Sequence, residues 1–392
     1  MTDYAKGKII PFQQGASFYM KRGAKEMEKN DLLSALRHYR QASLSAPEDP
    51  EPCIAMSEIL SQMQLFEESN RLLLLLIGSG NGTPECYFGL ACNYFGMREY
   101  DYAAENLENY LDADPDGPFA LDAEDFLDLI DDEDAMYDMT GLRTDQDYDD
   151  SAACVFARNL MNAGDFAGAI AELKRQTVVS PGSLPVKNQL AIALFCGGDR
   201  PGAKSVAQAI LKEHPEDNLA RCTLALCLHE AGDTEGALVR LDAAVASNTE
   251  AVEELSNISL LQMEFRQYPA AVATLRKLLT KTPYDENALH RYGYCQYVLG
   301  DAAGAQDCYK RLLKIHPGDT VARYYLTQSR KPVPDERTVR TRWMLVYQVP
   351  FAEAFRRLNQ INRHLSLPDE ELRALWRTDT HFMNLVEWAL YL

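Results

Sequence analysis

Hydrophobic residues recur along most of this chain at the three- and four-residue spacing of amphipathic helices, and small residues mark a longer period. In each unit a small residue is followed four places later by an apolar one, and in six of eight units by proline twelve places later. The small residues are Ala35, Ser69, Ala103, Ala169, Ala203, Ala237, Ala271 and Ala305. They lie 34 residues apart within each group, so the chain predicts three repeats, an interruption of 66 residues between Ala103 and Ala169, and five repeats.

The residue types predict that each repeat is a pair of antiparallel helices. Small side chains are expected where two helices approach closely. Helix breakers fall where the turn inside a unit should be, as at Gly198-Asp199 and Gly300-Asp301. A proline near the end of a unit stops the second helix. Because such a pair leaves apolar faces bare, neighbouring units should stack.

Within the unit from Glu85 to Pro115, the pattern is that of a known repeat. It contains Tyr87, Leu90-Ala91, Tyr94, Ala103, Leu107 and Pro115. This resembles the tetratricopeptide (TPR) pattern W-x2-L-G-x2-Y, A-x3-F, P, with conservative exchanges. The resemblance covers about residues 16–319. It implies an all-α fold, a right-handed α-α superhelix (a TPR solenoid) in two blocks.

The resulting organisation has six segments. A short N-terminal extension, 1–15, precedes the first block, 16–117. Residues 118–150 are expected to form a capping helix, from Phe119 to Ile130, and an acidic linker. The second block spans 151–319, followed by a closing helix and linker, 320–337. The segment 338–392 lies beyond the repeats and is predicted to be mostly helical, with a short strand from Trp343 to Val349 and an amphipathic helix from Phe351 to Leu365.

Composition and charge limit the function. The chain is 46% hydrophobic, has no apolar run long enough to cross a bilayer, and opens without a leader-like segment, so we expect a cytoplasmic protein. The net charge is −19; residues 320–392 carry 11 basic and 8 acidic residues, which leaves −22 on the rest. Such a body makes nucleic acid an unlikely partner and a basic protein segment a possible one.

Motifs of catalysis or metal binding are not evident. The nine cysteines show no C-x-x-C, the seven histidines form no close pair, and no cofactor is expected. Asp145, Asp147 and Asp149 alternate as in a calcium loop, but Asp150 and Phe156 occupy the places where an EF-hand needs Gly and Glu. These aspartates are therefore interpreted as part of a solvated linker.

The TPR resemblance implies a partner-binding surface on the concave side, lined by the first helix of each unit. Carried over to the second block, the peptide-binding residues are Arg158, Asn188, Phe195, His229, Met263, His290, Tyr294 and Tyr297. The alternative for each is that it packs against neighbouring repeats. The lysine/asparagine/arginine clamp that some members use for chaperone tails is absent, since Met20, Ala24, Cys154 and Arg158 stand at the corresponding positions.

Two functions follow as hypotheses. The first is a non-enzymatic scaffold or adaptor that binds a peptide or protein segment in the concave groove, with the apolar C-terminus WALYL competing for that groove. The alternative is a regulatory protein whose repeats sense a peptide while residues 338–392 act on DNA or an enzyme. The oligomeric state is left open.

Overall fold

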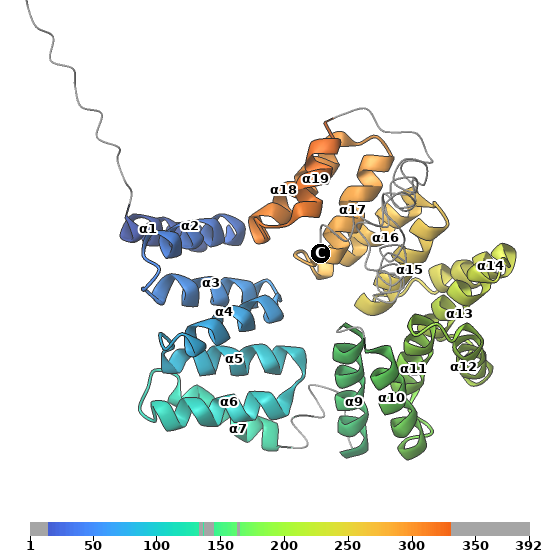
Figure 1. The fold of residues 1–392 in the computed structure, drawn as a ribbon, viewed down its shortest axis with the longest axis horizontal. Coiled ribbons are helices and arrows are strands. Elements are labelled where there is room, and N and C mark those ends of the chain that lie inside the picture. The colour runs from blue at the N-terminus through green and yellow to red at the C-terminus, as the bar shows by residue number, and fades with distance from the viewer. Residues whose placement is uncertain (1–14, 133–135, 137–144, 163–164, 331–392) are drawn as a thin grey trace, which may run out of the picture. The chain divides into compact units, whose positions relative to one another are not determined.

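The structure is a computed structural model that describes residues 15–132, 136, 145–162 and 165–330. This part of the chain contains eighteen helices and no strand (Figure 1). It divides into two compact units, Met1–Met136 and Tyr137–Leu392, each of which is considered by itself. The expectations for residues 1–14, for the linker from 331 and for the segment 338–392, including its strand and helices, lie outside the described residues.

Unit 1 is a stack of three helical hairpins followed by one more helix. The hairpins are formed by consecutive helices, and each packs on the next. The helices are α1 (Ala16–Glu28), α2 (Leu32–Ser45), α3 (Glu51–Gln62), α4 (Phe66–Gly78), α5 (Pro84–Met97), α6 (Tyr100–Ala113) and α7 (Ala120–Asp131). Phe88 of α5 stacks on Phe119 with ring centroids 4.6 Å apart, and Phe126 of α7 lies 6.3 Å from Phe88. Helix α7 therefore buries the apolar end of the stack, as expected of a capping helix.

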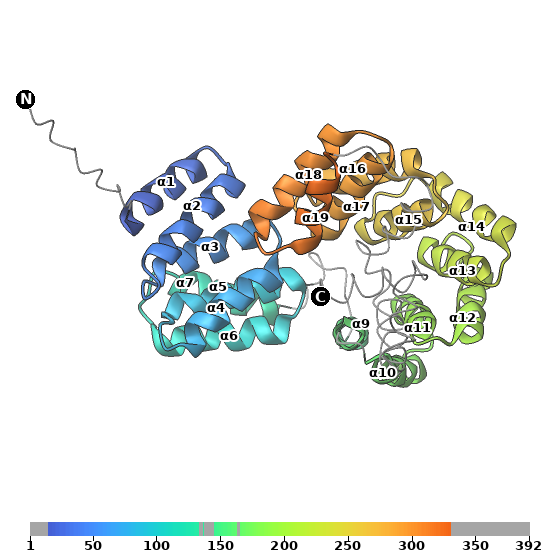
Figure 2. The same ribbon diagram turned by 45° about the horizontal axis from the view of Figure 1, so that its top comes forward.

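Unit 2 is a longer stack of the same kind. Its helices are α9 (Asp145–Asn162), α10 (Phe166–Val179), α11 (Leu184–Cys196), α12 (Arg200–Glu213), α13 (Asn218–Glu230), α14 (Thr234–Ala246), α15 (Val252–Glu264), α16 (Tyr268–Lys281), α17 (Glu286–Val298), α18 (Ala302–Ile315) and α19 (Thr320–Gln328). Figure 2 shows the stack as a curve with first helices such as α11, α15 and α17 on the inner side and α12, α14, α16 and α18 on the outer side. The predicted all-α solenoid is confirmed.

The 34-residue register defines the packing of the hairpins. The small residues of the register, Ser69 included, are all 0% exposed. Each lies early in a second helix, where only a small side chain fits against the first helix of the unit. A large residue there would overpack the stack, at a cost of about 1–3 kcal/mol.

The turn inside each hairpin has a fixed construction. One residue takes a left-handed backbone: Gly198, Gly232 and Gly300 at φ 92°, 87° and 83°. The following aspartate caps the second helix, and the carboxylate Oδ1 of Asp199 accepts a hydrogen bond from the Gly202 amide at 2.9 Å. At the same register position Asn30, Gln64, Arg98 and Arg266 also have positive φ, although they carry side chains.

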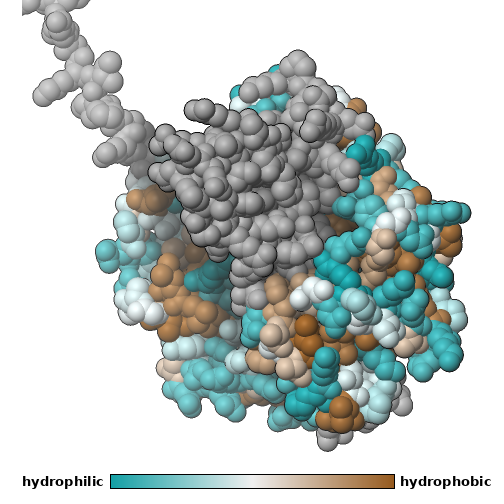
Figure 3. Space-filling model, turned by 45° about the vertical axis from the view of Figure 1, so that its right-hand side comes forward, coloured by the Kyte–Doolittle hydropathy of each residue, from teal (hydrophilic) through white to brown (hydrophobic). Residues whose placement is uncertain are grey.

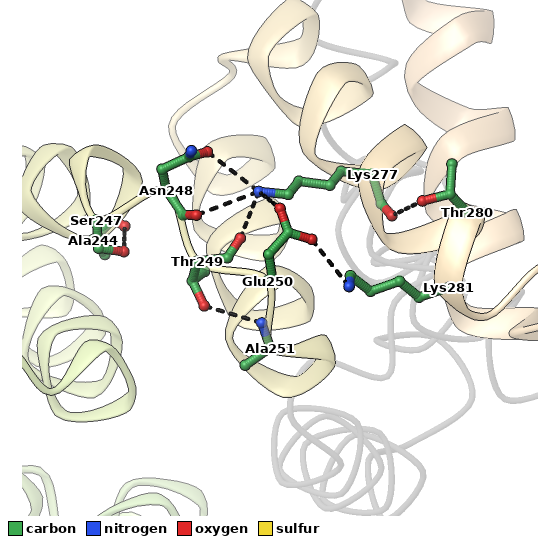
Figure 4. Close-up of polar contacts among 9 residues, drawn as sticks. All are labelled: Ala244, Ser247, Asn248, Thr249, Glu250, Ala251, Lys277, Thr280 and Lys281. Carbon is green, nitrogen blue, oxygen red and sulfur yellow. Dashed lines mark hydrogen bonds and ion pairs between the residues drawn. The ribbon is translucent and has the colours of Figure 1, made fainter.

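Of the two units that lack the motif proline, the one around Ala237 has Thr249 there and a different turn (Figure 4). Lys277 on α16 donates from Nζ to the carbonyl oxygen of Thr249 at 2.6 Å and to the side-chain oxygen of Asn248 at 3.2 Å. Glu250 lies between two ammonium groups, 2.6 Å from Lys277 and 3.0 Å from Lys281. A charged contact from the next hairpin thus fixes the backbone where proline would have done so.

The start of unit 2 differs from the sequence interpretation. Asp145, Asp147 and Asp149 were expected in a linker reaching residue 150, but they form the first turns of α9. Asp150 is buried, and its Oδ1 accepts a hydrogen bond from Gln176 Nε2 at 2.7 Å. Acidic residues are favourable at a helix N-terminus, because they complement the partial positive charge there. A run of aspartates can therefore begin a helix as well as fill a linker.

Candidate functional site

Two rows of residues recur at 34-residue spacing on successive first helices of unit 2. The first row is Arg158, Ile192, Leu226, Leu260 and Tyr294, and the second is Met161, Phe195, His229, Met263 and Tyr297. The first helices that carry these rows lie on the inner side of the curve (Figure 2). We refer to the face that carries the rows as the inner surface of unit 2, and most of its residues are apolar.

The predicted site residues differ widely in exposure. Arg158 is exposed, and His229 and His290 are partly buried. Asn188, Phe195, Met263, Tyr294 and Tyr297 are buried, with exposures of 4%, 5%, 1%, 0% and 3%. Their burial shows that these five side chains pack within the protein, which agrees with the alternative that each of them packs against neighbouring repeats. Their contact with a partner stays a prediction.

Polar pairs join one hairpin to the next beside these rows. Asn188 donates from Nδ2 to Oδ2 of Asp217 at 3.1 Å, and three repeats later His290 Nε2 lies 2.8 Å from Oδ2 of Asp319. Each aspartate also caps the helix that follows, accepting from Ala220 N or Ala322 N. Burial alone would raise the pKa of Asp319, but hydrogen bonding to His290 and its charge outweigh this and lower that pKa.

A charged cluster borders the second row near α12. The guanidinium of Arg200 lies 3.7 Å from the ring centroid of Phe195, a cation–π contact, and forms a two-pronged ion pair with Glu230 of α13. The equivalent position one repeat later holds Glu264, whose Oε1 is 3.5 Å from His229 Nε2. The carboxylates beside the apolar rows at α13 and α15 are therefore paired with Arg200 and His229 within unit 2.

The rows end in a group of aromatic side chains at α17–α19. Tyr325 of α19 lies 5.8 Å from Tyr294, 6.0 Å from Tyr297 and 5.6 Å from Tyr309 between ring centroids. Burial raises the pKa of both Tyr294 and Tyr309 well above the usual value for tyrosine. Sequence reasoning missed Tyr309 and Tyr325 as members of this cluster, although their positions in the register signal that they face α17.

Several buried polar atoms near the inner surface have no hydrogen-bond partner. They are Asn188 Oδ1, Arg200 Nη1, His229 Nδ1 and His290 Nδ1. A buried donor or acceptor without a partner is costly, typically about 1–3 kcal/mol. Such atoms are therefore candidates for contacts that a bound segment would supply.

The chemistry of the cysteines is that of structural thiols. All nine are free. Burial raises the pKa of Cys222 and Cys308 to about 12 and that of Cys154 and Cys227 to about 11. These thiols are protonated at neutral pH and are poor nucleophiles.

Metal ligands and membrane-spanning helices can be sought only among the residues that the structure describes. Among them no group of three or more His, Cys, Asp or Glu side chains could hold a metal ion. No helix in this part of the chain has the length and apolarity needed to cross a bilayer. On the face drawn in Figure 3, hydrophobic residues lie in small groups among hydrophilic ones.

Comparison with known proteins agrees with the repeat architecture. Two family models described as tetratricopeptide repeat match residues 188–252 and 287–319. TPR repeat-containing protein YvcD of Bacillus subtilis (strain 168) is 28% identical over 80% of this chain and 64% of its own length. Cellulose synthase operon protein C of Xanthomonas axonopodis pv. citri (strain 306) is 31% identical over 30% of this chain and 8% of its own. The chain thus spans less than two thirds of either relative.

Solved structures with a related fold are distant in sequence. The crystal structure of the APC/C hetero-tetramer Cut9–Hcn1 matches with 13% identity and a TM-score of 0.41, covering 82% of this chain and 57% of that one. A thermophilic TPR protein from Thermus thermophilus, TTC0263, matches with 16% identity and a TM-score of 0.39, covering 46% of this chain and 98% of its own.

Proposed function

Because this chain is a tetratricopeptide repeat protein, we propose that it is a non-enzymatic scaffold that holds a segment of another protein on the inner surface of unit 2. The observation that carries the proposal is the pair of apolar rows at 34-residue spacing, bordered by polar atoms that lack partners. Apolar side chains contribute area to an interface, and unsatisfied polar groups beside them fix the register of an extended ligand.

Ile192 and Leu226 are the most accessible apolar members of the rows, since both are partly buried rather than fully enclosed. They lie on α11 and α13, and Asn188, whose Oδ1 has no hydrogen-bond partner, is one helical turn before Ile192 on α11. A bound segment would place an apolar side chain against Ile192 and Leu226 and main-chain groups against the polar atoms.

A basic partner is favoured by charge. Residues 99–132, which include α6 and α7, contain thirteen acidic residues and no Lys, Arg or His. Complementary charge raises the association rate and favours basic segments over acidic ones. Nine free cysteines support a reducing compartment such as the cytoplasm.

The test is affinity capture from native lysate followed by direct binding measurements. The full-length chain is compared with Ile192→Arg on the inner surface and with Val178→Arg, whose native side chain is 80% exposed on α10, as the control. We expect proteins captured by wild type and Val178→Arg to be lost with Ile192→Arg, and purified candidates to bind more weakly as salt rises. Equal capture by both variants, with both folded by circular dichroism, would reject the inner surface as the site.

A further inference from the structure

Helices α3 and α5 of unit 1 each pack on the second helix of the hairpin before them. The face of α5 that makes this contact, here called its stacking face, is formed by Cys86, Leu90, Asn93 and Met97. Leu90 shares a hydrophobic core with Leu73 of α4. Asn93 donates from Nδ2 to Oγ of Ser69 on α4, 2.8 Å away. Inside the stack, the stacking face is therefore covered by a partner helix.

The stacking face of α1 has a different composition. At the same register positions α1 carries Phe18, Arg22, Lys25 and Lys29. Arg22 and Lys25 are exposed, whereas their counterparts on α5 are 2% and 0% exposed. Lys29 pairs with Glu26 of its own helix at 2.9 Å, but no described residue forms an ion pair with Arg22 or Lys25. This face, at the first described helix of the stack, is thus basic and open to a partner.

The opposite end of unit 1, formed by α7, is acidic (Figure 1). Helix α7 packs on α6 and the core through residues that include Ala120 and Ala123. Its outer face carries Leu121, Asp125 and Asp128, which are all exposed, Leu121 by 77%. Among the described residues, none forms an ion pair with Asp125 or Asp128. The outer face of α7 is therefore also without a partner helix.

The two end faces match in spacing and in charge. Phe18 on α1 and Leu121 on α7 are each followed four and seven residues later by charged side chains, cations on α1 and anions on α7. Residues with this spacing lie on one face of a helix. Two such helices placed side by side in parallel bring apolar against apolar and each cation against an anion. The match needs no change in either helix.

We infer that the stacking face of α1 binds the outer face of α7 in a second copy of this chain. Charge complementarity favours this occupant, because α19, at the end of unit 2, exposes Arg323 and Arg330, which have the same sign as the α1 face. The contact joins two different patches, so each molecule can bind one copy at each end of unit 1. The inference goes beyond the proposed function, since it concerns unit 1 and not the inner surface of unit 2.

Sedimentation of the full-length chain tests for this association. One helix face on another is a small interface, so we expect weak binding, with an average mass that rises above 44.1 kDa as protein concentration approaches about 1 mM. The chain carries a net charge of −19, and salt weakens the general repulsion between copies. A fall in mass at high salt would therefore report the complementary contact. A monomer at every concentration would overturn the inference and leave the α7 face to a basic segment of another protein.

Charge reversal identifies the two faces. We expect Arg22→Glu/Lys25→Glu on α1 and Asp125→Lys/Asp128→Lys on α7 each to remain monomeric, because each variant places like charges opposite each other. An equimolar mixture of the two should associate again, since the reversed α1 face then meets the reversed α7 face. Persistent association of either variant alone, or no recovery in the mixture, would overturn the inference.

The matched control is Lys174→Glu/Lys212→Glu, at exposed positions on α10 and α12 of unit 2. It changes the net charge by the same amount as the α1 variant and should associate like wild type. Loss of association in the control as well would assign the effect to net charge and overturn the inference. Far-UV circular dichroism confirms that each variant has the helix content of wild type before the masses are compared.

Discussion

Asn93 of α5 donates from its Nδ2 to the hydroxyl oxygen of Ser69 on α4, 2.8 Å away, and both side chains are 0% exposed. Ser69 stands where the other seven repeats carry alanine. Its hydroxyl in turn donates to the carbonyl oxygen of Ser57 at 2.9 Å, and the Asn93 amide also donates to Oδ1 of Asn70 at 2.7 Å. The exception in the register is therefore the centre of a satisfied polar network inside unit 1.

Ser69→Ala should destabilise the protein even though it restores the residue that the other repeats use. The substitution removes one partner of a fully buried amide, which costs about 1–3 kcal/mol. Urea unfolding measures the loss.

The control for this prediction is a double-mutant cycle with Asn93→Ala. If the two side chains act through their hydrogen bond, the losses should be non-additive by about 0.5–3 kcal/mol. Strictly additive losses would show that Ser69 and Asn93 contribute independently.

Gln64→Gly should stabilise unit 1. Gln64 is exposed and has φ 61° at the turn between α3 and α4, where three other units use glycine. The left-handed backbone costs a non-glycine residue about 1–2 kcal/mol, and part of the gain is offset because glycine has more freedom in the unfolded chain. We expect a net gain of about 0.5–1 kcal/mol by urea unfolding. Gly198→Ala at the equivalent position of unit 2 (φ 92°) should have the opposite sign; a shift of the same sign in both would contradict this explanation.

The sequence was sufficient for the features that the 34-residue period determines. Hairpins, buried alanines and the Gly-Asp turns follow from local residue types repeated in register, so their positions could be predicted. The start of α9 at Asp145 could not, because acidic residues favour both a linker and a helix N-terminus.

The side-chain contacts of the candidate site could not be predicted from the sequence, because they join residues that are distant along the chain. His290 and Asp319 are 29 residues apart, and Arg200 and Glu230 are 30 apart. The register predicts that Tyr294 and Tyr297 lie on the inner surface, but their burial depends on contacts such as those with Tyr325. Periodicity gives the face on which a residue lies; exposure depends on the partner opposite, which periodicity does not specify.

Lys277→Met should weaken the turn that replaces the motif proline. The substitution keeps the apolar stem but removes the donor to the Thr249 carbonyl and the Asn248 side chain. We expect a loss of about 1–2 kcal/mol, in the range for hydrogen bonds from a charged donor. Glu250→Gln removes only exposed ion pairs and should have a much smaller effect. Thermal unfolding of the two variants distinguishes the two explanations. If the ion pair with Glu250 were the source of the stabilisation, the two substitutions would lower the melting temperature equally.

The His290–Asp319 pair should make the free energy of unfolding depend on pH in the acid range. The pKa of Asp319 is lowered in the folded state, so its stabilising contribution is present above the unfolded value, about 3.9, and is lost as pH falls through the folded pKa. Asp319→Asn retains a capping side chain but cannot titrate. The urea midpoint of this variant should therefore fall less than that of wild type between about pH 5 and the acid limit of folding. Asp217→Asn is the matched control, because Asp217 has the same place in its repeat but faces the uncharged Asn188. If both substitutions reduced the fall of the urea midpoint equally, the effect would belong to the helix cap rather than to the charge of His290.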